Sequence, residues 1–214
     1  MTGPRIVIIE DHPLVAQGLA ALLHDGGRVV DIVLHPDHVE SSIQRHQPDL
    51  VLLDLSMPGR NGLELLPEIR RVKPSVKVLV VTMHFDRTIA EMAFEAGANG
   101  FIPKEGSADE LWKAITRVMK GKRYLSGRVG KRRYRSADVL EDRALERLTP
   151  RQREILALIA SGESSHRIGL RLGVTEKTIE YHRAAMRKVL GINSEWGLMR
   201  YAIVAGLGGR RAPR

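Results

Sequence analysis

The sequence predicts an α/β domain built on a doubly wound parallel sheet, followed by a smaller all-α domain of four helices. Three observations lead to this prediction. Short apolar runs separated by amphipathic stretches recur in the first 120 residues, which is typical of buried parallel strands alternating with helices. From residue 148 onward, segments with helix-start and helix-end residues follow one another instead. The charge also divides, because residues 1–120 carry a net charge of −3 and residues 121–214 a net charge of +12.

The strands of the first domain are predicted where branched apolar residues cluster. The first, third and fourth strands are expected at Ile6–Ile9, Leu50–Leu53 and Val78–Val81, a second at Val29–Leu34 and a short last one at Phe101-Ile102. Continuous apolar runs of this length are typical of strands that are buried on both faces.

Five helices are expected between and after these strands, because apolar residues there recur at helical spacing. Ser107 is a suitable N-cap for the last of them. Their expected ranges are 13–23, 36–46, 62–72, 87–96 and 107 to about 119. Five strand–helix units in this order predict a flavodoxin-like (βα)5 fold.

Polar side chains stand where the apolar strands end, at Glu10-Asp11, Asp54, Thr82 and Lys104. Ligands of open α/β sheets gather at the carboxyl ends of the strands, so these side chains are expected to meet in one crevice. Carboxylates are ligands that Mg²⁺ prefers, and an aspartate can act as a nucleophile. Lys104 and Thr82 offer a cation and a hydroxyl for phosphoryl oxygens. The sequence therefore predicts transfer of a phosphoryl group to Asp54.

Composition excludes several other classes of protein. The chain has no cysteine, which excludes disulfides, thiolate zinc sites and cysteine nucleophiles. No apolar stretch approaches the roughly 18 residues of a membrane span, and no signal peptide is evident at the N-terminus. We therefore expect a soluble cytoplasmic protein that does not interact with membranes.

The second domain is predicted from a cap residue at the start of each helix and a glycine after most of them. Its first helix begins with Thr149-Pro150-Arg151-Gln152, a capping-box pattern with proline at the first helical position. The other expected starts are Ser164 or Ser165, Thr175 and Ser194, and the expected ends are Gly162, Gly173 and Gly191. Two helices joined by a short glycine-containing turn form a DNA-binding hairpin.

The third helix of this domain has one apolar face and one polar face. Ile179, Met186 and Leu190 form the core side. The opposite side carries Lys177, Glu180, Tyr181, Ala184, Arg187 and Lys188. A DNA major groove admits such a helix, and lysines at its ends can bind phosphates. A glutamate can accept a hydrogen bond from a cytosine amino group, and a tyrosine or alanine can contact a thymine methyl group. The alternative reading of this face is a solvated surface.

A connector is expected at 121–147, between a first domain at 1–120 and a helical domain at 148–208, with a basic tail at 209–214. The connector contains a basic run at 128–135 and the pattern of a short helix toward its end. The basic run is interpreted as a solvated linker, with contact to DNA phosphates as the alternative.

Residues 4–120 resemble the receiver domain of two-component response regulators. The residues that carry the resemblance are Glu10 and Asp11, Asp54 with Met57-Pro58-Gly59 and Asn61-Gly62 after it, Thr82, Gly97-Ala98-Asn99-Gly100-Phe101, and Pro103-Lys104. The resemblance implies phosphorylation by a sensor histidine kinase. It also implies that the protein is not an enzyme in the usual sense, although a receiver domain catalyses its own phosphorylation and its own slow dephosphorylation.

The resemblance assigns roles to the residues of the crevice. Asp54 would be the phosphoacceptor and Lys104 would pair with the phosphoryl group. Mg²⁺ would be bound by Glu10, Asp11, Asp54 and the backbone carbonyl of Ser56.

The same resemblance implies a switch. Thr82 would move toward the phosphoryl group, and Phe101 would be the aromatic side chain that turns inward with it. Met83 departs from the family pattern, which usually has a small residue there. Its side chain would either restrict access to Asp54 or bend aside and change only rates.

Leu148–Glu154 and Thr175–Arg183 resemble the LuxR-type helix-turn-helix, so the whole chain resembles a NarL/FixJ-family response regulator. The family implies homodimers on an imperfect palindrome in promoter DNA. Its base-facing positions would be Glu180, Tyr181 and Ala184, with Lys177, Thr178 and Lys188 near phosphates.

One stretch of the helix-turn-helix departs from the family pattern. Ser165-His166-Arg167-Ile168-Gly169 stands where the family more often has Asn-Lys-Glu-Ile-Ala. Glycine inside a helix costs about 1 kcal/mol relative to alanine, so this helix is expected to be softer or differently packed.

Three functions remain open on the sequence. The first is a transcription factor switched by phosphorylation of Asp54. The second is a phosphorylation-independent DNA-binding regulator whose receiver is a protein-interaction module, which only Met83 favours. The third, a phosphatase-like enzyme using Asp54, has no second catalytic acid at a suitable place and leaves the DNA-binding pattern unexplained.

Overall fold

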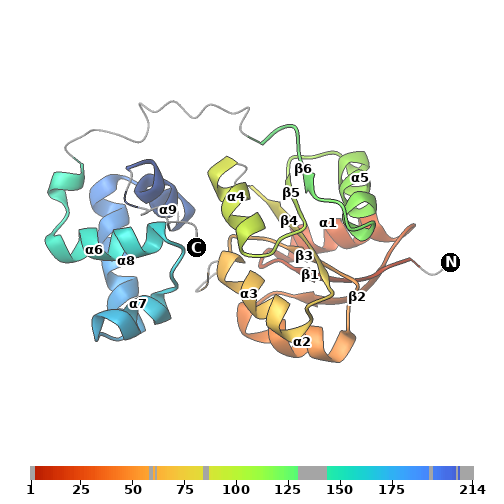
Figure 1. The fold of residues 1–214 in the computed structure, drawn as a ribbon, viewed down its shortest axis with the longest axis horizontal. Coiled ribbons are helices and arrows are strands. Elements are labelled where there is room, and N and C mark those ends of the chain that lie inside the picture. The colour runs from red at the N-terminus through yellow and green to blue at the C-terminus, as the bar shows by residue number, and fades with distance from the viewer. Residues whose placement is uncertain are drawn as a thin grey trace. The chain divides into compact units, whose positions relative to one another are not determined.

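The computed structural model describes residues 3–57, 60, 62–83, 87–129, 144–192, 195–205 and 207. Contacts between residues divide the chain into two units, Met1–Arg132 and Arg133–Arg214, each described by itself below (Figure 1). Pro58, Gly59 and Asn61 of the receiver motif lie outside the described residues, as do most of the basic run, Ser194 and the basic tail.

The first unit is built on a sheet in which every paired strand is parallel, with the order β2-β1-β3-β4-β5-β6. Its strands are β1 (Arg5–Ile9), β2 (Arg28–Val33), β3 (Leu50–Leu53), β4 (Lys77–Thr82), β5 (Gly100–Pro103) and β6 (Tyr124–Leu125). All five predicted strands are confirmed. The sixth was not predicted, and it lies within the stretch that was expected to be connector.

Helices cover both faces of this sheet, as a doubly wound fold requires. They are α1 (Pro13–Leu23), η1 (Pro36–His38) leading into α2 (Val39–His46), α3 (Gly62–Val72), α4 (Arg87–Glu95) and α5 (Ala108–Met119). Helices α1 and α5 lie on one side of the sheet, and α2, α3 and α4 lie on the other (Figure 1). The five predicted helices are confirmed, although the first turn of the second is a 3-10 helix.

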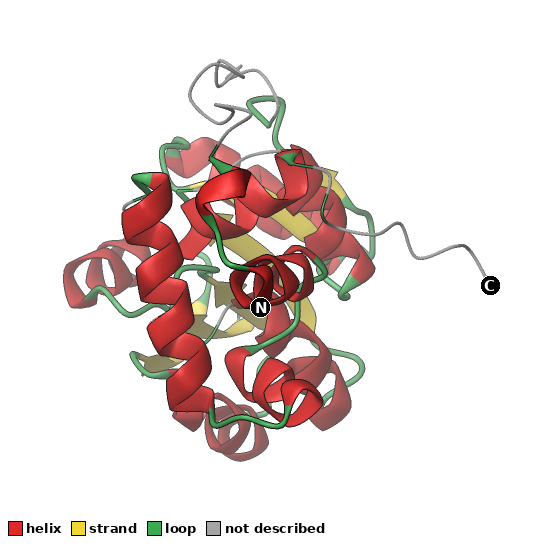
Figure 2. Ribbon diagram, turned by 90° about the vertical axis from the view of Figure 1, so that its left-hand side faces the viewer, coloured by secondary structure: helices red, strands yellow, loops and turns green. Residues whose placement is uncertain are grey.

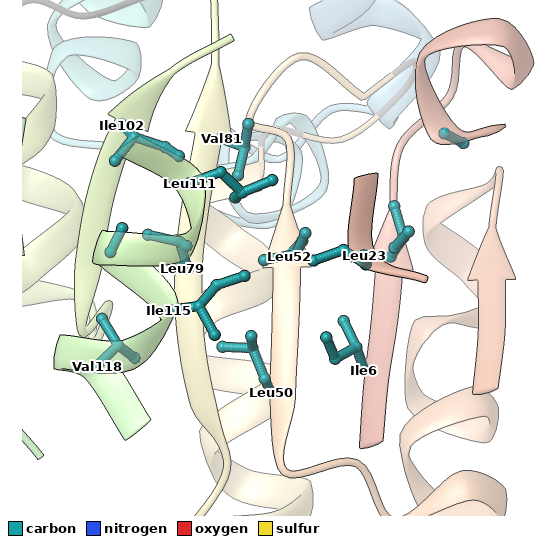
Figure 3. Packing of buried hydrophobic residues seen from close by; sticks show 13 residues of the cluster. Ile6, Leu23, Leu50, Leu52, Leu79, Val81, Ile102, Leu111, Ile115 and Val118 are labelled. Carbon is teal, nitrogen blue, oxygen red and sulfur yellow. The ribbon is translucent and has the colours of Figure 1, made fainter. Parts of the chain in front are cut away.

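The core explains why the strand sequences are apolar at every position. Alternate residues such as Ile6, Leu50 and Leu79 point toward α1 and α5, where they contact Ile115 and its neighbours (Figure 3). The intervening residues, such as Val51, are equally buried against the helices on the other face.

A half-buried arginine joins three segments at the edge of the sheet opposite the carboxyl ends. The Arg70 guanidinium on α3 donates to the carbonyl oxygens of Gly97 at 2.9 Å and of Pro74 at 3.1 Å, and also to that of Val76. It also donates to Asn99 Oδ1 at 2.5 Å, which in turn accepts from the backbone N–H of Val78, where β4 begins. Part of the receiver motif, Gly97 and Asn99, therefore has a structural role as the partner of Arg70.

Strand β6 attaches the start of the connector to the last strand of the sheet. Leu125 lies opposite Phe101, and the backbone N–H of Ser126 donates to the Phe101 carbonyl at 3.0 Å. Ser126 Oγ donates to Glu110 at 2.5 Å, and Arg128 donates to the Glu105 carbonyl at 2.9 Å. The chain therefore stays bound to the first unit beyond residue 120.

The described part of the second unit consists of helices and loops without a strand (Figure 2). Its elements are η3 (Leu145–Arg147), α6 (Pro150–Ala160), α7 (Ser165–Leu172), α8 (Glu176–Leu190) and α9 (Glu195–Val204). The four predicted helices are confirmed. Of the short helix expected before them, only the turn η3 falls within the described residues.

The helix ends follow from the residues that the sequence places there. Thr149 and Gln152 form a complete capping box at α6. Ser164 caps α7 and Thr175 caps α8, each accepting a hydrogen bond from a backbone N–H of the first turn. Gly173 ends α7 with φ +67°, a left-handed conformation that glycine adopts without strain.

Gly169 has a packing role that its helix propensity does not reveal. A Cβ built on Gly169 would lie 2.8 Å from the Val174 carbonyl oxygen in the turn between α7 and α8. The Val174 N–H also donates to the Gly169 carbonyl at 3.0 Å. The missing side chain lets the turn approach α7 closely. That this helix is softer or packed differently from the family's stays a prediction.

Candidate functional site

The polar side chains at the strand ends meet in one pocket of the first unit. Lys104, after β5, places its Nζ 2.8 Å from Asp54 Oδ2 and 2.5 Å from Glu10 Oε2. The three side chains are 10%, 2% and 1% exposed, respectively. One buried ammonium thus bridges two buried carboxylates that come from strands β3 and β1.

Backbone hydrogen bonds extend the sheet past the strand ends and fix these positions. The N–H of Glu10 donates to the Val33 carbonyl at 3.0 Å, and that of Asp54 to the Ile9 carbonyl at 2.9 Å. The N–H of Lys104 donates to the Thr82 carbonyl at 2.8 Å. The side chains of the pocket are therefore held by the most rigid part of the unit.

A glycine is needed directly beside the backbone of Asp54 and Leu55. A Cβ on Gly62 would lie 2.6 Å from the Asp54 carbonyl oxygen and 2.5 Å from Leu55 Cα. Gly62 begins α3, and its N–H donates to the Leu55 carbonyl at 2.9 Å. Gly62 thus permits close approach of α3 to the segment that carries Asp54.

Acidic ligands suitable for a cation gather at the end of β1. Ligating atoms of Glu10, Asp11 and His12 lie within 4.8 Å of one another. The His12 Nδ1 lies 2.9 Å from Asp11 Oδ1, and the backbone N–H of His12 donates to Glu10 Oε1 at 3.2 Å. His12 was not among the predicted site residues, and its position directly after two acids was the signal that could have found it.

The oxygen atoms of the pocket fit a hard divalent cation. Among the described residues, no donor makes a hydrogen bond to the buried Asp54 Oδ1, and a buried oxygen in that state costs about 1–3 kcal/mol unless something binds it. Together with Glu10 and Asp11 it provides the carboxylate oxygens that Mg²⁺ prefers. Ser56 was expected to contribute its backbone carbonyl; its buried hydroxyl oxygen likewise has no hydrogen-bond partner.

The charge of Lys104 is secured by its neighbours. Burial by itself lowers the pKa of Lys104, but hydrogen bonds and charge attraction from Asp54 and Glu10 outweigh burial and leave that pKa raised. The ammonium is therefore charged at neutral pH and available to a phosphoryl oxygen on Asp54.

The two expected switch residues are both inside the unit. Thr82 ends β4 and Phe101 lies on β5, and neither side chain is exposed. The phenyl ring therefore already occupies an inward position in this structure, and its role as a switch stays a prediction.

Met83 lies outside the core, because half of its surface is exposed. We expect Met83→Ala to raise the rate of Asp54 phosphorylation by acetyl phosphate several-fold, because a methyl group shields the neighbouring pocket less than a thioether chain. The melting temperature should change little, since an exposed side chain contributes little to stability. Stopped-flow measurements of phosphorylation check this, and equal rates in the two proteins would mean that Met83 does not restrict access to Asp54.

The polar face of α8 in the second unit is only partly open to solvent. Tyr181 is 72% exposed, and Lys177, Ala184 and Lys188 are also exposed. The other two predicted contact residues, Thr178 and Glu180, are half-buried; Thr178 Oγ1 lies 2.8 Å from the Thr175 hydroxyl, and Glu180 accepts from Ser165.

The buried side of α8 consists mainly of the expected residues. Ile179 and Met186 are fully buried and Leu190 is half-buried. Arg183 is also buried, which the sequence pattern did not indicate.

None of the described helices combines the length and the apolar character that a membrane crossing requires.

Comparisons with known proteins cover both units. Residues 6–116 match the family model described as the response regulator receiver domain, and residues 146–202 match that of the bacterial regulatory proteins of the luxR family. The chain is 33% identical over 210 residues to the transcriptional regulatory protein MctR of Rhizobium johnstonii, covering 95% of this chain and 94% of that protein. It is 32% identical over 195 residues to the nitrate/nitrite response regulator protein NarL of Escherichia coli, covering 88% and 90%.

A similar solved structure is that of RcsB from Salmonella enterica serovar Typhimurium, bound to a promoter in the presence of the phosphomimetic BeF3−. It is 25% identical, with a TM-score of 0.59, and the match covers 95% of this chain and 99% of that one. The sequence relationship extends over both units in the same order. The chain therefore belongs to the luxR-family response regulators, in which a receiver domain is joined to a DNA-binding helix-turn-helix domain.

Proposed function

We propose that this response regulator is switched by phosphorylation of Asp54 by a sensor histidine kinase, with Mg²⁺ as the cofactor. The observation that carries the proposal is the Lys104 ammonium 2.8 Å from one buried oxygen of Asp54, while the other oxygen accepts no hydrogen bond from the part of the chain that the structure describes. A carboxylate with a free oxygen beside a fixed cation is suited to attack phosphorus and to retain the product.

The reaction follows from this placement. An oxygen of Asp54 attacks the phosphorus of a phosphohistidine, a P–O bond forms, and the P–N bond to the imidazole breaks, leaving the electron pair on nitrogen. Lys104 and the Thr82 hydroxyl stabilise the charge on the transferred oxygens. Glu10, Asp11, Asp54 and the Ser56 carbonyl would hold Mg²⁺, which neutralises phosphoryl charge when bound.

The second unit would carry the output. Helix α8 would enter the major groove, with Glu180, Tyr181 and Ala184 near base edges and Lys177, Thr178 and Lys188 near phosphates. The net charge of +12 on residues 121–214 favours DNA as the partner. The relative RcsB is described bound to a promoter in the presence of a phosphomimetic, which supports phosphorylation-dependent binding here. RcsB dimers are also described bound to DNA, and we propose that this protein binds as a homodimer too, on an imperfect palindrome.

We place the protein in the cytoplasm, where a kinase and promoter DNA are both within reach. We take residues 1–120 as the receiver, 121–147 as the connector, 148–208 as the DNA-binding domain and 209–214 as the tail. The alternative, a DNA-binding regulator that does not use phosphate, gains no support from the pocket, because Lys104, Asp54 and Glu10 are already in contact.

The proposal is tested by incubating the full chain with acetyl phosphate and Mg²⁺, followed by phosphate-affinity electrophoresis. The wild type is expected to shift, and Asp54→Asn is expected not to shift, because an amide cannot act as the nucleophile. Phosphorylation should also strengthen binding to duplex DNA selected from a randomised pool. If neither acetyl phosphate nor a cognate kinase phosphorylates Asp54, the DNA-binding regulator that does not use phosphate becomes the better account.

A further inference from the structure

Glu180 lies at the border between the buried and the exposed faces of α8. Successive helix residues are separated by about 100° around the axis. Ile179 and Arg183 point into the unit and are buried, whereas Tyr181 points the opposite way and is exposed. Glu180 lies between the two directions and is half-buried. One carboxylate can therefore reach both inward to the protein and outward to a groove of DNA.

A chain of two hydrogen bonds fixes the inward oxygen. Arg183 Nη1 donates to Ser165 Oγ at 2.8 Å, and Ser165 Oγ donates to Glu180 Oε1. Ser165 is 4% exposed and Arg183 is 7% exposed, so the bond between them is buried, whereas the bond from Ser165 to the half-buried Glu180 is partly buried. Ser165 is the first residue of α7, so the chain joins the two helices of the helix-turn-helix.

The direction of each bond follows from the chemistry of the three groups. A guanidinium has only donors and an ionised carboxylate has only acceptors. The Ser165 hydroxyl must therefore accept from Arg183 and give its single proton to Glu180. The rotation of the hydroxyl is thus determined, and so is the orientation of the carboxylate that accepts from it.

The outward oxygen of Glu180 makes no hydrogen bond within the described part of the chain. In a major groove, a carboxylate oxygen accepts from the N4 amino group of cytosine. A carboxylate already held by its other oxygen presents that acceptor in one direction, whereas a free glutamate would distribute it over several rotamers.

We propose that Ser165 is a positioning residue for DNA recognition: its hydroxyl, oriented by Arg183, fixes Glu180 so that α8 selects cytosine at one base pair of each half-site. This inference rests on the proposed role of α8 in the major groove. It also gives a function to one residue of the stretch where this chain departs from the family pattern, since serine stands there instead of asparagine.

The test measures base preference with the phosphorylated full chain and a duplex library that has a randomised central segment. The wild type is expected to enrich a motif with a cytosine in each half-site. Glu180→Gln should reduce the preference at that base pair about tenfold, because an amide presents a donor as well as an acceptor there. Ser165→Ala should reduce the preference several-fold at the same base pair, and the double variant should be no worse than Glu180→Gln alone.

Two further variants separate positioning from folding. Ser165→Thr keeps the hydroxyl and should keep the wild-type preference. Ser164→Ala is the matched control, because Ser164 caps the same helix through the Arg167 N–H at 3.0 Å without contacting Glu180. It should lower the melting temperature and weaken binding to all sequences alike.

Several outcomes would overturn the proposal. If Ser165→Ala weakens binding to every sequence equally, as Ser164→Ala does, Ser165 only joins α7 to α8. The same conclusion follows if Ser165→Thr loses the preference together with Ser165→Ala, or if Ser165→Ala keeps it intact. A wild type that enriches no sequence at all would remove the proposed DNA-binding function itself, and the inference with it.

Discussion

Lys104→Met is expected to destabilise the receiver domain by about 3–5 kcal/mol, the usual effect of removing one partner of a buried ion pair. In the wild type, the Lys104 ammonium lies between Asp54 and Glu10, whose side chains are almost fully buried. Methionine fills similar space without a charge, so two carboxylates would repel each other in a pocket with little water. Differential scanning calorimetry of the full chain measures the shift of the receiver transition.

The same variant should respond to Mg²⁺ more strongly than the wild type. A cation bound by Asp54 and Glu10 would replace the missing ammonium, and a ligand that binds only the folded state stabilises it by mass action. Lys113→Met is the control, because Lys113 is an exposed lysine on α5. A Lys104→Met protein as stable as this control, with or without Mg²⁺, would contradict the expected role of the ion pairs.

The pH dependence of the wild type follows from the raised pKa of Lys104. Burial opposes the charge, but Asp54 and Glu10 together raise the pKa above its ordinary value of 10.5. A group with a raised folded-state pKa contributes its full stabilisation below its unfolded-state pKa and loses it as pH rises through the folded-state pKa. The charge of Lys104 should therefore stabilise the receiver throughout the neutral range and cease to do so in alkali.

Arg70→Met is expected to destabilise the same domain by about 3–4 kcal/mol, because hydrogen bonds to a charged group contribute more than neutral ones. The guanidinium donates to backbone carbonyls at Gly97 and Val76 and to the Asn99 side chain. Methionine packs its chain similarly but leaves these oxygens without their donor. Arg70→Lys should recover only part of the loss, because one ammonium cannot reproduce the planar fork.

Arg71→Met is the matched control for this change. Arg71 is the next residue on α3 and forms an exposed ion pair with Glu40 at 2.8 Å. Its removal should change stability by about 0.5 kcal/mol or less. Calorimetry should show a large shift of the receiver transition for Arg70→Met alone. Equal shifts for both variants would mean that the hydrogen bonds of Arg70 stabilise the domain no more than an exposed ion pair does.

The parts of the fold that the sequence predicted are those that depend on local pattern. Strands such as β3 and β4 are buried on both faces, so each is a continuous apolar run with an identifiable end. The helices of the second unit have capping residues such as Thr149 and Thr175 in the chain itself. The pocket was predictable for a related reason: parallel strands bring their carboxyl ends to one edge.

The features that the sequence did not predict depend on partners that are distant in the chain. Strand β6 is two residues long, and only its pairing with β5 makes it a strand. Arg70 and Arg183 look like ordinary exposed arginines of amphipathic helices. Arg70 is half-buried and Arg183 is buried, and the hydrogen bonds that each makes depend on where carbonyls and hydroxyls from other segments lie. The role of Gly169 likewise requires knowledge of the Val174 carbonyl five residues later.

The attachment of β6 connects the start of the connector directly to the backbone of β5. The Ser126 N–H donates to the carbonyl of Phe101, and Arg128 holds the carbonyl of Glu105, the neighbour of Lys104. The β5 backbone is therefore tied to the start of the connector by single hydrogen bonds as far along the chain as Arg128.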